Sequence, residues 1–229
     1  MTEPADAARA RHRRCVPRSL LMGDPVAVAP RLLGLLLVHG ARAGRIVEVE
    51  AYRGEDDPAS HAYRGRTARN ATMYGNAGLL YVYFTYGMHW CANVVCGPAG
   101  VAGAVLLRAL EPVAGLSEMR LARAERRRGH VAPTERELCR GPGNLTCALG
   151  IGPDHDGTDL VRPAGARDVD RARGSVAGSA PRLADDGQRR TIEWASGPRI
   201  GISRAEDAPW RYWVLGSPYV SATRASRVR

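Results

Sequence analysis

The hydrophobic and polar residues of this chain change from a helical to an extended pattern after Gly34. Asp24 followed by Pro25 is typical of a helix start, and the apolar residues behind them predict a helix that ends near Gly34. Gly87 separates two extended runs, which predicts a protruding β-hairpin with Tyr86 at its tip. In all, extended apolar runs predict β-strands at 35–38, 45–52, 79–86, 89–96 and 101–109.

Alternation within these strands predicts which side chains share a face. In the strand at 45–52, one face is expected to carry Ile46, Glu48, Glu50 and Tyr52. In the strand at 101–109, Leu106 and Arg108 are expected on the same face. Residues 53–78 are rich in Gly, Asp, Asn, Arg and Pro, which predicts a long irregular loop. A loop of that length inside a compact domain is often functional.

The second half of the chain combines short helices with polar stretches. The pattern predicts a helix at 117–128, and residues 134–137 match a capping box at the start of a short helix. Residues 144–149 predict another short helix. The stretch 162–190 is polar and rich in Gly, Asp and Arg, which predicts a loop with weak structure. Strand patterning returns at 192–220.

The ends of the chain differ in composition from its middle. Residues 1–18 are rich in Ala and Arg, and we expect them to form a disordered basic arm. No internal repeat or domain boundary is visible between 20 and 221, and 229 residues are enough for one domain with a sizeable core. We therefore expect one domain at 19–221 and a short tail at 222–229.

The formal net charge is +10, and all 33 cationic side chains are arginine. A strongly basic chain favours a polyanionic partner such as nucleic acid, because phosphate contacts release counterions. A solvated basic surface is the alternative reading. The absence of lysine from the sequence excludes covalent catalysis through a lysine Schiff base.

The cysteines and histidines argue against a metal site. The five cysteines form no Cys-x-x-Cys pair, and the six histidines show no His-x-x-x-His spacing. We therefore expect no metal, no disulfide framework and a reduced, cytoplasmic setting. No apolar run approaches the ~18 residues that a membrane span needs, and the N-terminus lacks an apolar signal core.

A carboxylate lies among aromatic residues in the predicted strands. Glu50 is two residues from Tyr52, and the next strand brings Tyr81, Tyr83 and Tyr86. Aromatic faces with one acid predict a pocket that stacks a flat ring and activates a water molecule, and in a basic protein that ring is expected to be a nucleobase. The pattern alone makes Glu48 an equal candidate for the acid.

Five ordered blocks carry a resemblance to a known family. They are GRIVEVEAY at 44–52, LYVYFTYGMHWCANVV at 80–95, AVLLRALEP at 104–112, ELCRGPGNL at 137–145 and RYWVLGSPYVS at 211–221. In these blocks the chain resembles the alkyladenine (3-methyladenine) DNA glycosylases over roughly 20–221. The resemblance implies a single compact α/β (mixed α+β) domain, with a curved antiparallel sheet and a hairpin that reaches into the DNA minor groove.

The resemblance assigns the catalytic and stacking roles. Glu50 matches the general base that activates water, and it is selected over Glu48 because it precedes the pocket tyrosine by two residues. Tyr52, His61 and Tyr83 match the residues that sandwich the flipped base.

The remaining matches concern DNA and the pocket walls. Tyr86 matches the residue that fills the gap left in the duplex, and Met88 matches a minor-groove contact. Asn93 matches a residue that helps to reject undamaged guanine. Leu106 matches the floor of the pocket, and Arg108 matches a residue near the catalytic water and the DNA backbone.

The implied reaction is hydrolysis of the N-glycosidic bond of a damaged purine, flipped out of double-stranded DNA, by a monomeric, monofunctional enzyme without cofactor near the bacterial nucleoid. Alkylated purines, deaminated or etheno purines and bulky adducts all stay open as lesions. Three alternatives remain: a damage-binding protein that does not excise, a formyltransferase-like RNA-binding domain, and a self-resistance glycosylase specialised for one bulky adduct. Glu50 argues against the first alternative. The Tyr86 tip and the Glu50–Tyr52 pair argue against the second.

Overall fold

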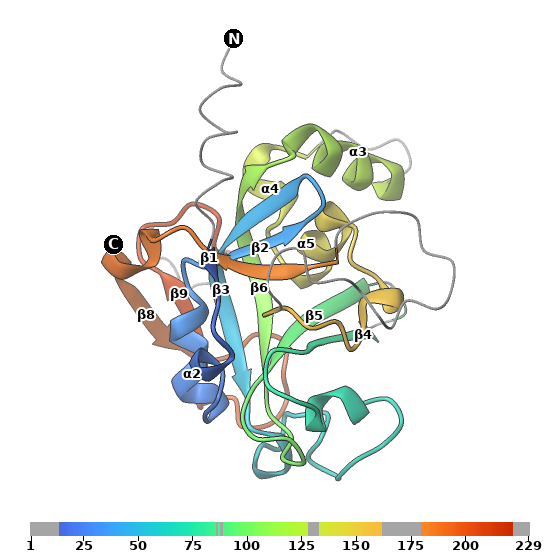
Figure 1. Ribbon diagram of the computed structural model, residues 1–229, viewed down its shortest axis with the longest axis vertical. Coiled ribbons are helices and arrows are strands. Elements are labelled where there is room, and N and C mark those ends of the chain that lie inside the picture. The colour runs from blue at the N-terminus through green and yellow to red at the C-terminus, as the bar shows by residue number, and fades with distance from the viewer. Residues whose placement is uncertain (1–13, 86, 88, 128–132, 162–179, 222–229) are drawn as a thin grey trace.

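An antiparallel sheet of nine strands organises the fold (Figure 1). The computed structural model describes residues 14–85, 87, 89–127, 133–161 and 180–221. The strand order is β1-β7-β2-β3-β6-β5-β4, and β9 pairs with both β3 and β8. The strands are β1 Arg14–Cys15, β2 Leu36–His39, β3 Arg42–Tyr52, β4 Leu80–Thr85, β5 His89–Val95, β6 Ala104–Ala114, β7 Arg182–Asp185, β8 Trp194–Gly197 and β9 Arg211–Val214.

Helices pack around this sheet. In the described residues they are α2 Pro25–Leu32, α3 Leu116–Arg127, α4 Glu135–Leu138 and α5 Pro142–Leu149. Short 3-10 helices are η1 Arg18–Leu20, η2 Gly54–Asp56, η3 Ala71–Tyr74, η4 Pro153–His155 and η5 Gln188–Thr191. Helix α2 packs on β3 and β6, whereas α5 packs on β5, β6 and α3. The expected single compact domain of mixed α+β class with a large antiparallel sheet is confirmed.

The start of α2 follows the sequence prediction. The side chain of Asp24 accepts a hydrogen bond from the amide of Val26 at 2.8 Å, and Pro25 occupies the first helical position. Such a cap satisfies one of the amide groups that a helix start leaves unpaired. No helix among the described segments is long and apolar enough to cross a membrane.

The predicted hairpin is also present. Strands β4 and β5 pair in antiparallel register from Leu80 opposite Val94 to Thr85 opposite His89. The predicted tip residue Tyr86 and its companion Met88 lie outside the described residues.

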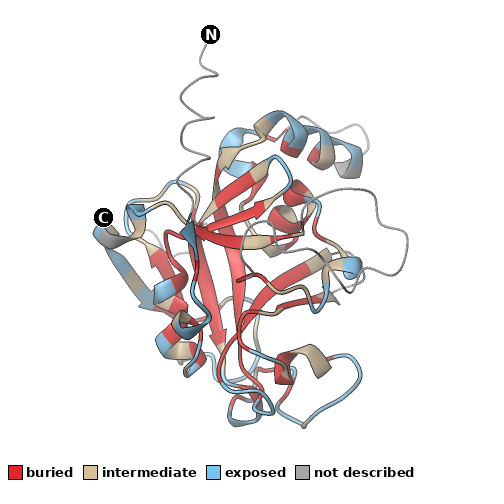
Figure 2. Cartoon of the chain, viewed as in Figure 1, coloured by how far each residue is buried: buried red, intermediate tan, exposed pale blue. Residues whose placement is uncertain are grey.

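The central strands separate an apolar core from a second, more polar face. Figure 2 shows buried residues running along these strands. On one face, the main core contains Val49, Ala51, Leu80, Val82, Ala92, Val94, Val105 and Leu107. On the other face, a cavity is lined by Tyr52, Tyr81, Tyr83, Cys91, Asn93, Leu106 and Arg108. The alternation predicted for Leu106 and Arg108 therefore holds.

A bulge in β3 makes the prediction for Ile46 wrong. Ile46 packs in the main core with Val49, although simple alternation placed it on the face of Glu48 and Glu50. The pairing of β3 with β6 shifts register between Ile46 and Glu48 and again between Glu48 and Val49. A bulge inserts an extra residue and therefore reverses the facing of the residues before it.

The prediction of a loop at 162–190 is corrected for its last part. Residues 182–185 form β7, which pairs with β2 and with β1, and η5 follows it. Residues 162–179 lie outside the described residues. Arg14 and Cys15 form β1 and pair with β7, so this part of the stretch expected as a disordered arm joins the sheet.

Candidate active site

A cavity of about 530 Å³ opens on the polar face of the sheet. Its floor comes from β3, β4, β5 and β6, and its rim comes from the loop at 58–61, from the start of α5 and from 200–204. The side chains that share the floor are cross-strand neighbours: Tyr81 pairs with Asn93, and Asn93 pairs with Leu106. Typical ligand pockets have volumes of roughly 300–1,000 Å³. This cavity is therefore large enough for a nucleobase.

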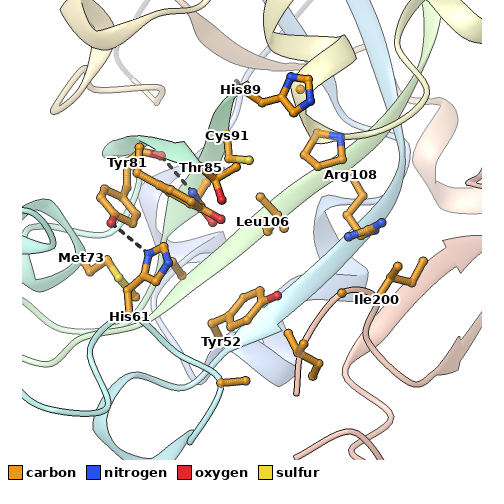
Figure 3. A pocket seen from close by; sticks show the side chains of 18 of the residues that line it. Tyr52, His61, Met73, Tyr81, Thr85, His89, Cys91, Leu106, Arg108 and Ile200 are labelled. Carbon is orange, nitrogen blue, oxygen red and sulfur yellow. Dashed lines mark hydrogen bonds between the residues drawn. The ribbon is translucent and has the colours of Figure 1, made fainter. Parts of the chain in front are cut away.

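Aromatic rings form one wall of the cavity. The rings of His61 and Tyr83 meet edge to face with centroids 4.4 Å apart, and Tyr81 stacks on Tyr83 at 5.4 Å. His61 Nδ1 and the Tyr81 hydroxyl are hydrogen-bonded at 3.2 Å. Tyr52 comes from β3 and lies apart from this cluster in Figure 3. The three proposed stacking residues thus line one cavity, with Tyr52 apart from the other two.

These aromatic groups are neutral at physiological pH. Burial lowers the pKa of His61, and the Arg69 cation lowers it further. Burial raises the pKa of Tyr81 to about 12 and also raises the pKa values of Tyr52 and Tyr83. The wall therefore presents uncharged rings, which favours stacking with an electron-poor base.

Glu50 is fully buried and does not itself line the cavity, but it contacts residues that do. Its Oε1 accepts a hydrogen bond from the Ile200 amide at 2.7 Å, and its Oε2 accepts one from the Tyr52 hydroxyl at 3.0 Å. Arg108 Nη1 lies 3.2 Å from Oε1. Burial raises the pKa of Glu50, and the Arg108 cation, the Ile200 amide and the Tyr52 hydroxyl oppose that rise without cancelling it.

A second buried carboxylate, Glu48, lies on the same strand but contacts a different set of groups. Its Oε1 is 3.2 Å from Arg108 Nε and 3.0 Å from Arg211 Nη1. Its Oε2 accepts a hydrogen bond from the Ser221 amide at 2.7 Å. Arg108 therefore bridges the two carboxylates, and Glu48 has two further partners, Arg211 and Ser221, that do not line the cavity.

The other predicted pocket residues are in the same place. Asn93 is buried, and its Nδ2 donates to the Tyr81 carbonyl at 3.1 Å. Leu106 and Arg108 lie on β6 next to Asn93, with Leu106 between Tyr81 and Arg108 in Figure 3. Tyr86 and Met88 lie outside the described residues, so their predicted contacts with DNA stay predictions.

Sequence reasoning missed a buried ion pair behind the cavity. Arg199 and Asp57 are both fully buried, and Arg199 also lies over the ring of Tyr52. The two residues are 142 positions apart in the chain, and neither belongs to a recognisable motif. Cys91, a free thiol that lines the cavity beside Tyr83, was also missed.

The cavity combines acid–base groups with aromatic rings. Across the described residues, no group of three or more His, Cys, Asp or Glu side chains could hold a metal ion. One buried carboxylate, one arginine and a set of neutral rings can stack a planar base and activate a nucleophile beside it.

Known proteins resemble the chain along most of its length. The sequence pattern of the methylpurine-DNA glycosylase (MPG) family matches residues 19–218. A protein of Burkholderia cenocepacia is 53% identical over 207 residues, which covers 90% of each chain. A protein of Nocardia farcinica is 49% identical over 211 residues, again with 90% of each chain covered. Both carry a provisional name as 3-methyladenine DNA glycosylases. The chain therefore belongs to the methylpurine-DNA glycosylase family, whose members are DNA glycosylases for alkylated bases.

Proposed function

We propose that this DNA glycosylase takes a damaged purine out of the duplex and hydrolyses its N-glycosidic bond with a water activated by Glu50. The observation that supports the proposal is the setting of Glu50: it is fully buried, and the three groups that contact it, from Tyr52, Arg108 and Ile200, all belong to residues lining the cavity. A general base needs such fixed placement beside the reacting atom.

The number of hydrogen-bond acceptor positions on Glu50 supports a role for a bound water molecule. An ionised carboxylate offers about four acceptor positions. Tyr52, Ile200 and Arg108 use three of them in the described structure. The remaining position accepts a hydrogen bond from the attacking water, which adds to the sugar carbon as the base departs and leaves an abasic site.

The cavity suits a purine that is already cationic through alkylation at N3 or N7. A cation gains energy over the faces of Tyr52 and Tyr83. A neutral His61 does not repel that cation, and its pKa is lowered by burial. A cationic purine leaves without protonation, whereas a neutral etheno or deaminated purine needs an acid. Asn93, on the floor, is proposed to crowd the exocyclic group of undamaged guanine.

We extend the proposal to DNA and to the course of the reaction. Tyr86 fills the gap left by the flipped nucleotide, and Met88 contacts the minor groove. The +10 charge binds the phosphate backbone of double-stranded DNA. The enzyme acts as a monomer at the bacterial nucleoid in the cytoplasm, without cofactor, and it does not nick the strand because the sequence has no lysine for an imine.

The test is base release from labelled duplexes that carry an alkylated adenine, ethenoadenine or hypoxanthine, in EDTA and without added cofactor. We expect free alkylated base and a strand that stays intact until alkali is added. Glu50→Gln is expected to lose roughly 10²–10⁴-fold in single-turnover rate while retaining lesion binding. Glu193→Gln, at an exposed glutamate, is the matched control and should react normally.

The results separate the alternatives. Near-normal turnover by Glu50→Gln would remove its catalytic role. Tight lesion binding without any base release would support a non-catalytic damage-binding protein. Release from a bulky adduct alone would identify a specialised glycosylase.

A further inference from the structure

A buried ion pair connects segments that are distant in sequence behind the cavity. Arg199 Nη1 and Nη2 lie 2.5 and 2.9 Å from the carboxylate oxygens of Asp57, and both side chains have no exposed surface. Asp57 also accepts hydrogen bonds from the amides of Arg53 and Ala59. Neither member of the pair lines the cavity, so both act through their neighbours.

Arg199 touches the Tyr52 wall directly. Its guanidinium carbon lies 4.7 Å from the centre of the Tyr52 ring and 4.9 Å from that of Trp210. Its Nη1 also donates to the carbonyl of Ala51 at 2.9 Å. One face of the Tyr52 ring is thus held by a cation, and Tyr52 still lines the cavity.

The same pair fixes two segments of the rim. Arg199 precedes Ile200, whose amide donates to Glu50 at 2.7 Å. Asp57 precedes Pro58 and Ala59, which line the cavity on the loop that also carries His61. One ion pair therefore connects the stacking tyrosine, the loop of the opposing wall and a hydrogen-bond donor of the carboxylate.

We propose that Arg199 and Asp57 are positioning residues that hold Tyr52 and the Ile200 amide in place around Glu50. This inference rests on the proposed hydrolytic function. Burying two charges contributes little net stability compared with apolar residues of the same size, because desolvation offsets the attraction. The contacts of Arg199 with Tyr52 and beside Ile200 give the pair a role in alignment instead.

The proposal predicts a change in the pH dependence of the reaction. The charged and titratable groups around Glu50 come from every strand of the floor: Glu48 and Tyr52 on β3, Tyr83 on β4, Cys91 on β5 and Arg108 on β6. The Ile200 amide lowers the pKa of Glu50. If that amide moves away, the pKa of Glu50 rises, and the acid limb of the rate profile moves to higher pH.

The test compares full-length Arg199→Met, Arg199→Lys and Asp57→Asn with the natural chain. The measurement is single-turnover release of 7-methylguanine from a duplex across pH, corrected for the folded fraction. Arg199→Met is expected to lose roughly 10²-fold in rate, as small misplacements do, and to move the acid limb to higher pH. Arg199→Lys is expected to restore part of the rate.

The matched control is Arg45→Met, which breaks a largely buried ion pair with Asp186 that does not line the cavity. It should leave the rate per folded molecule and the acid limb unchanged. An unchanged acid limb in all three ion-pair variants would overturn the proposal, since a merely structural role only lowers the folded fraction. If Arg199→Met does not fold, Arg199→Lys and Asp57→Asn decide in the same way. Absence of release by the natural chain would instead contradict the proposed function.

Discussion

The two faces of strands β3 to β6 bury opposite kinds of side chain. The core face buries apolar residues such as Leu107 and Val94, whereas Glu48, Glu50 and Arg108 on the cavity side are also buried. Buried charges cost free energy unless they are paired. Apolar burial on one face of this sheet therefore offsets the free-energy cost of burying charged side chains on the other.

Two adjacent leucines on β6 provide the sharpest test of this comparison. Leu107→Ala is expected to lower the free energy of unfolding by about 2–5 kcal/mol, because it leaves a void in the closed core. Leu106 lines an open cavity, so Leu106→Ala should lower the free energy of unfolding by less. Denaturant titrations measure the free energy of unfolding, and base release per folded molecule measures catalysis. Equal stability losses would show that the two faces do not differ in this way.

Removing Arg108 tests the charged face. Its cation lowers the pKa of Glu50, so Arg108→Gln should raise that pKa. A base must be ionised to work, and the acid limb of the single-turnover profile should therefore move to higher pH. At neutral pH we expect a loss on the order of 10²-fold. The profile of the natural chain is the reference, and an unmoved acid limb would mean that Arg108 does not set the charge of Glu50.

Substitution of Tyr86, the residue predicted at the hairpin tip, is expected to have the smallest of these effects. Tyr86→Ser should weaken binding of lesion duplex by about 1–3 kcal/mol, the range for one stacked aromatic. Binding of undamaged duplex should change less, because it depends on phosphate contacts. Fluorescence anisotropy on matched duplexes measures both. Equal losses on the two duplexes would remove the role in filling the gap.

Short-range patterns made the central strands, the α2 cap and the β4–β5 hairpin predictable. Alternation predicted Leu106 and Arg108 on one face, and both line the cavity although the pairing of β3 with β6 shifts register next to Arg108. The facing of Ile46 was not predictable, since nothing in the sequence marks the bulge after it. Strand β7 was missed because its short, polar sequence is held by pairing with β2 and β1 rather than by its own pattern.

The family resemblance selected Glu50 over Glu48, a choice that alternation alone does not make. In the structure, Glu50 contacts cavity-lining groups of Tyr52, Arg108 and Ile200, whereas Glu48 shares Arg108 with it and also contacts Arg211 and Ser221. Arg199 and Asp57 escaped notice because their pairing joins positions 142 residues apart. Contacts over such separations arise from the folded topology and leave no local signal.

The attachment of β3 on both sides has a consequence for redesign. Glu50 lies opposite Leu106 on β6 and Arg211 on β9, so its backbone is held from two directions. Much of the rim comes instead from irregular segments at 58–61 and 201–204. Under the proposed function, varying Ile202, Ser203 and Pro58 while keeping Arg199 and Ile200 should therefore change the size of base admitted and leave Glu50 and its partners in place. The rim can thus be varied separately from the strands that carry the proposed base and the proposed stacking tyrosines, which suits directed evolution toward bulkier adducts.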